Sequence, residues 1–226
     1  MDASRFSFLT YGVAARMGKI GAALVLLSTP LAAEEVTVLA LGDSLTQGFG
    51  LPQEDGLVPQ LQRWLDERGV DATLINAGVS GDTTAGGAAR VGWSLTPEVD
   101  AMIVTLGGND MLRGLDPAEA RHNIETILQV AQTEDVDVLL VGMQAPGNYG
   151  PEYKEAFDSL YPDLAQAYGT LFFESFFSGL GSNDPAQLRP FFQADGIHPN
   201  ATGVARIVDA LGPAVLTLVQ SSAAAD

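Results

Sequence analysis

Three side chains in this sequence have the types and the placement needed for nucleophilic acyl transfer. Ser44 lies just beyond an apolar run over residues 36–41, after Gly42 and Asp43, and offers a hydroxyl at a strand-to-helix turn. His198 can take the serine proton and return it to a leaving group. Asp195 lies three residues earlier, where a tight turn lets its carboxylate accept the other imidazole N–H. We expect these residues to be nucleophile, base and acid.

Two further residues could stabilise the negative charge that develops during such a reaction. Gly81 follows the apolar run 72–75, and the absence of a side chain lets its N–H approach an oxyanion closely. Asn109 follows the run 101–106 and offers a side-chain amide to the same oxygen. Together with the amide of Ser44, these groups predict an oxyanion hole.

Each of these residues alone also has a purely structural interpretation. Ser44 alone fits the role of a helix cap, and Gly81 fits a turn. The Asn109 side chain fits a role in hydrogen bonds to local backbone groups. His198 and Asp195 fit an ordinary loop. The chemical interpretation therefore rests on their occurrence together, after successive strands.

The remaining polar residues near these runs are given simpler roles. The second histidine, His122, lies in a predicted helix, and we expect it at the surface. Asp43 and Asp110 flank the site residues and are expected to make structural hydrogen bonds. The sequence has no G-x-S-x-G elbow, no Walker A motif, no G-x-G-x-x-G after a strand and no H-E-x-x-H pair.

The composition excludes several classes of protein. The chain has 226 residues, with 28 acidic and 11 basic side chains, a formal charge of −17 and no cysteine. A hydrophobic content of 46% is too high for a disordered polyelectrolyte. The negative charge argues against binding to nucleic acid or to anionic lipid, and the missing cysteines exclude disulfides and zinc–thiolate sites.

Residues 1–33 have the layout of a secretory signal peptide. Basic residues come first, an apolar run over 20–27 follows, and small residues precede Glu34. Cleavage after Ala33 would leave a single domain over 34–226 that acts in the periplasm or outside the cell, with no stable membrane span. Met17 is an alternative translation start, and a buried first helix or an uncleaved anchor is the alternative interpretation of the segment.

The rest of the chain alternates apolar strands with amphipathic helices. Asp116, Pro117 and Glu119 predict the start of one helix, and Asn200 is expected to cap a last one, with a frayed tail from Ser221. A further helix is predicted over 152–168. The predicted strands are 36–41, 72–75, 101–106, 136–141 and 171–173. This alternation indicates an α/β protein with a mainly parallel five-stranded sheet and a ligand site at the carboxyl ends of its strands.

Four short blocks make the sequence resemble the GDSL, or SGNH, hydrolases, and most of all their bacterial thioesterase I, lysophospholipase L1 and arylesterase branch. Residues 42–45 read GDSL, 80–83 read SGDT, 107–110 read GGND and 195–199 read DGIHP. The similarity covers about residues 36–218. It implies a flavodoxin-like three-layer α/β/α sandwich, no metal or organic cofactor, Ser44, Asp195 and His198 as catalytic residues, and Ser44, Gly81 and Asn109 as the oxyanion hole.

The resemblance also implies a serine esterase that hydrolyses esters and thioesters through an acyl-enzyme. Alternatives are a carbohydrate O-deacetylase or an acyltransferase with the same triad, or a non-catalytic lipid- or glycan-binding protein. A monomer acting on a small-molecule or lipid ester is expected. An apolar groove for an acyl chain is predicted from six residues, although several of them could equally belong to the core: Met111, Met143, Ala145, Pro146, Tyr149 and Ile197.

Overall fold

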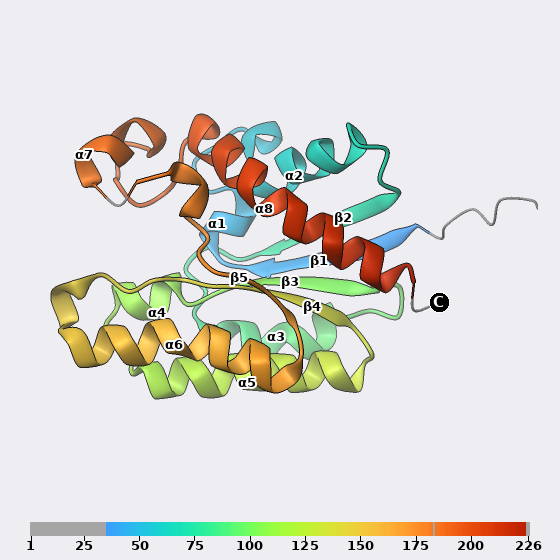
Figure 1. Ribbon diagram of the computed structural model, residues 1–226, viewed down its shortest axis with the longest axis horizontal. Helices are drawn as coiled ribbons and strands as arrows, with labels where there is room; N and C mark the ends of the chain where they lie inside the picture. The colour runs from blue at the N-terminus through green and yellow to red at the C-terminus, as the bar shows by residue number, and fades with distance from the viewer. Residues whose placement is uncertain (1–34, 183, 225–226) are drawn as a thin grey trace, which may run out of the picture. The chain divides into compact units, whose positions relative to one another are not determined.

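The computed structural model describes residues 35–182 and 184–224 of the chain (Figure 1). The predicted signal segment, residues 1–33, lies outside the described residues. Within them the chain alternates strands and helices from end to end, as the sequence pattern predicts.

The centre of the fold is a five-stranded sheet in the order β2-β1-β3-β4-β5, and every pairing in it is parallel. Its strands are β1 (Val36–Gly42), β2 (Ala72–Gly78), β3 (Ala101–Thr105), β4 (Asp137–Val141) and β5 (Leu171–Phe173). The predicted fold class is therefore confirmed. Strand β2 runs three residues beyond its predicted end, because it pairs with β1 as far as Gly42 and Gly78.

The strands form where they do because both faces of the sheet are covered. The three inner strands are continuous apolar runs, and Val38, Leu41, Val104 and Leu139 are fully buried within them. Such runs are typical of parallel strands with helices on both sides. Edge strand β2 instead has exposed positions, including Ile75.

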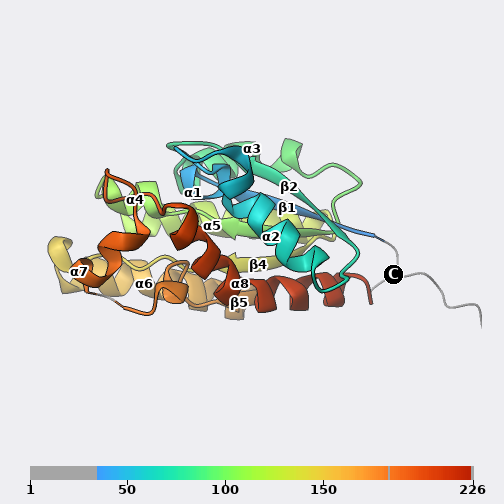
Figure 2. The same cartoon turned by 90° about the horizontal axis from the view of Figure 1, so that it is seen from above.

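Two helical layers cover the sheet. Helices α2 (Leu57–Asp66) and α8 (Ala201–Ser222) pack together on one face, and α3 (Thr84–Ser94), α5 (Pro117–Thr133) and α6 (Pro151–Tyr168) cover the other (Figures 1 and 2). The order of strands and layers is that of a three-layer α/β/α sandwich. Short helices α1 (Ser44–Gln47), α4 (Gly108–Leu112) and α7 (Pro185–Leu188) lie in the connections.

The predicted helix caps form as expected. The Asp116 carboxylate accepts from the N–H of Ala118, with Pro117 in the first turn of α5, and the Asn200 side chain accepts from Gly203 at the start of α8. Helix α3 was not predicted, because its Gly- and Ala-rich sequence has little helical periodicity.

The end of α8 corrects one expectation. The helix continues through Ser222 rather than fraying from Ser221, because the buried Ser222 hydroxyl donates to Asp137 at 2.8 Å. By length and composition, α8 is the one described helix that could cross a membrane. Half of its apolar window is buried inside the protein, and core helices pass the same test.

Candidate active site

Three of the predicted site residues form a hydrogen-bonded chain at the carboxyl end of the sheet. His198 Nε2 lies 2.9 Å from Ser44 Oγ, and His198 Nδ1 lies 2.7 Å from Asp195 Oδ2. Because a carboxylate can only accept, Nδ1 carries the proton and Nε2 presents its lone pair to the serine hydroxyl. This is the geometry that lets a serine lose its proton to a histidine.

Ser44 is placed by the turn that ends β1. Asp43 caps α1 through a hydrogen bond from the N–H of Leu45 to its Oδ1 at 2.9 Å, so Ser44 becomes the first helical residue. Its amide donates to no acceptor among the described residues. The nucleophile segment thus offers both a hydroxyl and a free N–H at one point.

His198 is held by a compact loop. Asp195 Oδ1 accepts from the N–H groups of Ile197 and His198, at 2.9 and 3.0 Å. The hydrogen bond from His198, followed by these two amide bonds, lowers the pKa of Asp195 from 3.8 to about 2. Asp195 therefore stays ionised throughout the pH range of ordinary assays.

Two residues that sequence reasoning did not single out join this loop to the nucleophile segment. The Phe49 ring packs on the His198 ring with centroids 4.6 Å apart. The Gln193 side-chain amide donates to the carbonyls of Phe49 at 2.8 Å and Pro199 at 3.0 Å. No motif marks these residues, because Gln193 and Phe49 are themselves 144 positions apart in the sequence.

Gly81 and Asn109 lie on neighbouring loops that are bonded to each other. Gly81 has φ +83°, a left-handed conformation that favours glycine, and its N–H has no acceptor among the described residues. The Asn109 side-chain nitrogen donates to the Asp82 carbonyl at 2.9 Å and to Asp43 Oδ2 at 3.1 Å. The structure therefore joins the Ser44, Gly81 and Asn109 segments through the Asn109 side chain.

Buried charges hold the loop that carries Gly81. Arg90 donates to Asp82 at 2.7 Å and to the Gly42 carbonyl at 2.9 Å, which ties the loop to the end of β1. Asp110 accepts from both the N–H and the hydroxyl of Thr84, at 2.9 and 2.6 Å. The structural role expected of Asp110 is confirmed, and Arg90 and Asp82 are additions that the sequence did not indicate.

A glycine and a tyrosine set the start of α4, which carries Asn109. Gly107 has φ +111°, and a Cβ there would lie 2.1 Å from the Tyr161 hydroxyl. That hydroxyl donates to the Leu106 carbonyl at 2.9 Å, and burial raises the pKa of Tyr161 well above its usual value. Tyr161 thus stays a neutral donor beneath the site.

The residues of the predicted acyl groove divide into two groups. Met143 and Ala145 are buried in the core, and Met111 packs against it. Pro146, Tyr149 and Ile197 are exposed. The second group is exposed to solvent, as are Phe49 and Leu112, whereas Met111 is half-buried.

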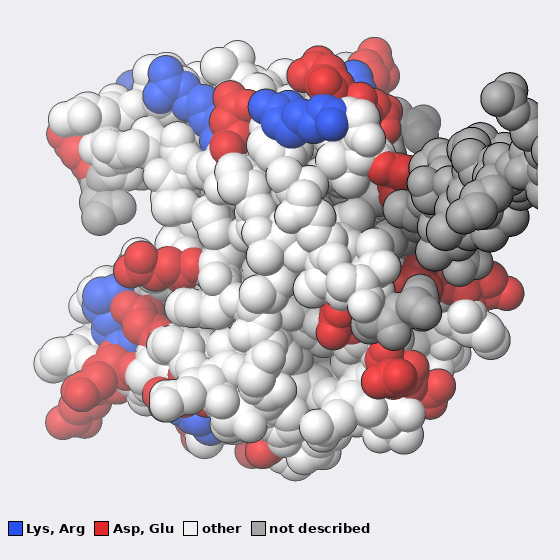
Figure 3. Space-filling model, turned by 45° about the vertical axis from the view of Figure 1, so that its right-hand side comes forward, with Lys and Arg blue, Asp and Glu red and all other residues white. Residues whose placement is uncertain are grey.

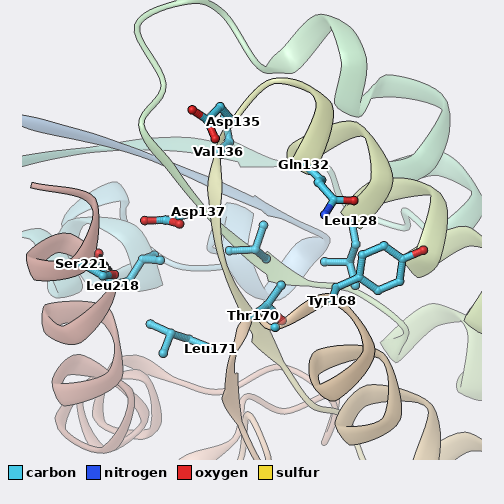
Figure 4. Close-up of a pocket in the computed structure, with 12 residues that line it drawn as sticks. Leu128, Gln132, Asp135, Val136, Asp137, Tyr168, Thr170, Leu171, Leu218 and Ser221 are labelled. Atoms are coloured by element: carbon cyan, nitrogen blue, oxygen red, sulfur yellow. Dashed lines mark hydrogen bonds between the residues drawn. The ribbon is translucent and has the colours of Figure 1, made fainter. Parts of the chain in front are cut away.

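A cavity of about 320 Å³ lies away from this site. The first residues of β4 and β5, Asp137 and Leu171, are among the residues that line it (Figure 4). Since the strands are parallel, that is the opposite end of the sheet from Ser44. A much smaller hollow, of about 10 Å³, adjoins Ser44, Phe49 and His198. Within residues 35–182 and 184–224, no group of three His, Asp or Glu side chains is placed to hold a metal ion.

The sequence and the fold both match known esterases. Residues 40–206 match the GDSL-like lipase/acylhydrolase family. Esterase TesA of Pseudomonas aeruginosa is 40% identical over 198 residues, which cover 87% of this chain and 95% of that protein. Thioesterase 1/protease 1/lysophospholipase L1 of Escherichia coli K12 is 34% identical, over 87% of this chain and 90% of that protein.

Solved structures of esterases are also similar to this chain in sequence and in fold. The SGNH-hydrolase family esterase AlinE4 is 41% identical, with a TM-score of 0.67, over 81% of this chain and 96% of its own. The psychrotrophic esterase EstA from Pseudoalteromonas sp., solved in a form inhibited by monoethylphosphonate, is 29% identical with a TM-score of 0.74, over 81% of this chain and 98% of its own.

The fold, the site and these similarities define a serine hydrolase that acts on ester bonds. The chain belongs to the GDSL-like lipase/acylhydrolase family.

Proposed function

We propose that this protein hydrolyses carboxylic esters and thioesters through an acyl-enzyme intermediate formed on Ser44. The observation that carries this function is the continuous chain Asp195–His198–Ser44, with its two contacts of 2.7 and 2.9 Å. A structural histidine would not need its free ring nitrogen aimed at a serine hydroxyl at the end of a parallel sheet.

Each step of the reaction uses a group already in place. Ser44 Oγ attacks the carbonyl carbon while its proton passes to His198 Nε2, and Asp195 stabilises the imidazolium. The negative oxygen is bound by the N–H groups of Ser44 and Gly81 and by the Asn109 amide, which turns to it one of the two N–H groups that otherwise bond to Asp82 and Asp43. His198 then protonates the leaving alcohol or thiol, and water activated by His198 releases the acid.

The exposed apolar side chains beside the site support an ester with an apolar acyl part. Phe49 packs on the His198 ring, and Ile197 directly precedes His198. Leu112 ends α4 and Tyr149 lies in the connection after β4, where its hydroxyl is 3.4 Å from the Leu112 carbonyl. Contact with an acyl chain would remove these side chains from water, at roughly 25 cal/mol per Å² of apolar surface.

The proposed site is tested with p-nitrophenyl esters of increasing acyl length. We expect the parent protein to turn over and Ser44→Ala to lose activity by several orders of magnitude, because the nucleophile is gone. A phosphonate ester should label the parent on Ser44 and leave the variant unlabelled by mass spectrometry. Equal rates in the two proteins, or label on another residue, would contradict the assignment.

We further propose that residues 1–33 direct the chain out of the cytoplasm and that the enzyme works in the periplasm or outside the cell. The basic, apolar and small-residue regions of this segment support export. The mass of the protein recovered from the periplasm of an expressing bacterium tests it. A product that begins near Glu34 is expected, and an intact N-terminus found only in the cytoplasm would refute export.

A further inference from the structure

Asp43 is a buried carboxylate that the proposed reaction does not use. It is 1% exposed and precedes the nucleophile. Its Oδ1 accepts from the Leu45 N–H at 2.9 Å, and its Oδ2 accepts from Asn109 Nδ2 at 3.1 Å. The first bond caps α1, but the second is not needed for any helix. Since an uncompensated buried carboxylate is costly, the contact with Asn109 calls for a function.

Both partners of Asn109 Nδ2 are acceptors. The Asp82 carbonyl can only accept, and an ionised Asp43 can only accept. The two contacts therefore determine which end of the Asn109 amide is nitrogen and which is oxygen. They also hold this nitrogen between the Ser44 segment and the loop that carries Gly81.

We propose that Asp43 is a positioning residue for the oxyanion hole, whose carboxylate keeps the Asn109 amide turned with its nitrogen, rather than its oxygen, toward the reacting carbonyl oxygen, to which one of its two N–H groups shifts as the negative charge develops. This role rests on the proposed function, because it acts only through Asn109 as an oxyanion donor. Without the second acceptor, the amide can rotate and present its own oxygen, which would repel the developing negative charge.

The ionisation of Asp43 then controls the donor. Burial raises the pKa of Asp43 from 3.8 to about 6, against the opposing effects of its two hydrogen bonds and of His198. Asp110 raises it further, and Tyr161 is the other titratable group that interacts with it. Below this pKa, the Asp43 carboxyl is protonated and neutral, and it is a weaker acceptor for the N–H of Asn109.

The variant Asp43→Asn separates the two bonds of Asp43. Its amide oxygen can still cap α1, but its NH₂ would face the NH₂ of Asn109, and two donors cannot bond to each other. We expect a loss of kcat approaching the roughly 10²-fold typical of removing one oxyanion donor, with little change in KM. The double variant Asp43→Asn/Asn109→Ala should be no slower than Asn109→Ala alone.

The pH dependence provides a readout that a merely structural role would not move. The ratio of parent to Asp43→Asn kcat should be large at pH 8 and should approach one below about pH 6, because the parent carboxyl is then neutral too. The matched control is Asp116→Asn, since Asp116 caps α5 through a bond of the same 2.9 Å length and is exposed. Its ratio should stay near one at every pH.

Two results would overturn the role of Asp43: losses that multiply in the double variant, or a parent-to-variant ratio that does not change with pH. If Asp43→Asn does not fold, Asp43→Ser keeps a capping oxygen without the second acceptor and takes its place in both measurements. In the Ser44→Ala protein, the side-chain amide NMR signals of Asn109 should still titrate with Asp43. Loss of that titration contradicts the Asp43–Asn109 contact, whereas an intact titration in a protein whose Ser44 proves dispensable contradicts only the proposed function.

Discussion

At the scale of single residues, the chemistry depends on which atom faces which. Ser44 and His198 are 154 positions apart, yet their reactive atoms lie 2.9 Å apart. The proton on His198 Nδ1 is assigned by its carboxylate partner, so the free nitrogen is the one that faces the nucleophile. The hydrogen bond that His198 donates to Asp195 thus decides the tautomer that general-base catalysis requires.

The two histidines provide a matched pair for this conclusion. His198→Ala should lower kcat/KM by several orders of magnitude, because no other described side chain can accept the Ser44 proton. His122→Ala should retain full activity, because His122 is exposed on α5, where its backbone carbonyl rather than its ring accepts a hydrogen bond from Thr126 on the same helix. Steady-state kinetics with one p-nitrophenyl ester measures kcat/KM of both variants. Comparable losses in the two would contradict the proposal that His198 is the base.

At the scale of elements, the site is assembled from loops that follow successive strands. The β1 turn carries Ser44, the β2 loop carries Gly81, and the short helix after β3 carries Asn109. Hydrogen bonds between these loops hold them in place, because a loop by itself can adopt other conformations. Arg90 on α3 supplies one, bridging Asp82 in the Gly81 loop to the carbonyl of Gly42 at the end of β1.

Removing this bridge should weaken both the fold and the site. Arg90→Met leaves the Asp82 carboxylate without its partner in a largely buried setting, where the side chains are 10% and 16% exposed, and should cost about 3–5 kcal/mol of unfolding free energy. Arg121→Met breaks an exposed ion pair with Asp163 and should cost less than about 1 kcal/mol. Urea unfolding of both variants tests the difference, and similar costs would show that the buried bridge contributes nothing special.

At the scale of the whole molecule, acidic groups dominate the charge. The net charge is −17, and on the face drawn in Figure 3 acidic side chains border a broad uncharged surface with only a few basic ones among them. Such a surface favours solubility over binding to polyanions. The buried Asp43 differs from these solvated acids, because its burial raises the pKa of its carboxyl group.

The raised pKa of Asp43 should make the free energy of unfolding depend on pH. The folded protein holds the Asp43 proton up to about pH 6, whereas the unfolded chain releases it near pH 3.8. The folded state therefore binds more protons in this window, and the contribution of Asp43 to stability falls as the pH rises through it. Relative to Asp43→Asn, the parent should lose up to about 3 kcal/mol of unfolding free energy between pH 4 and pH 7.

Denaturant unfolding of parent and variant at several pH values measures this difference, in which the contributions of other groups cancel. A constant difference would mean that Asp43 titrates like an exposed aspartate. Combined with the kinetics, the expected result would make Asp43 a residue that lowers stability at neutral pH while supporting activity.

The sequence by itself determined the fold class and indicated the candidate residues of the site. Hydrophobic runs such as 36–41 and 136–141 are local signals of buried parallel strands, and helix caps such as Asp116 and Asn200 act within a few residues. Three of the four motif blocks follow the ends of β1, β2 and β3, so their convergence follows from the parallel order of the sheet, whereas the block over 195–199 lies in the loop before α8.

Only the tertiary structure decided how those residues are held. Arg90 bonds to Gly42 across 48 positions and Gln193 bonds to Phe49 across 144, and no local pattern reports such pairings. The burial of Met143 and Ala145 and the exposure of Tyr149 depend on which elements pack over them. The raised pKa of Asp43 likewise arises from desolvation by the assembled fold, a property that no stretch of sequence has alone.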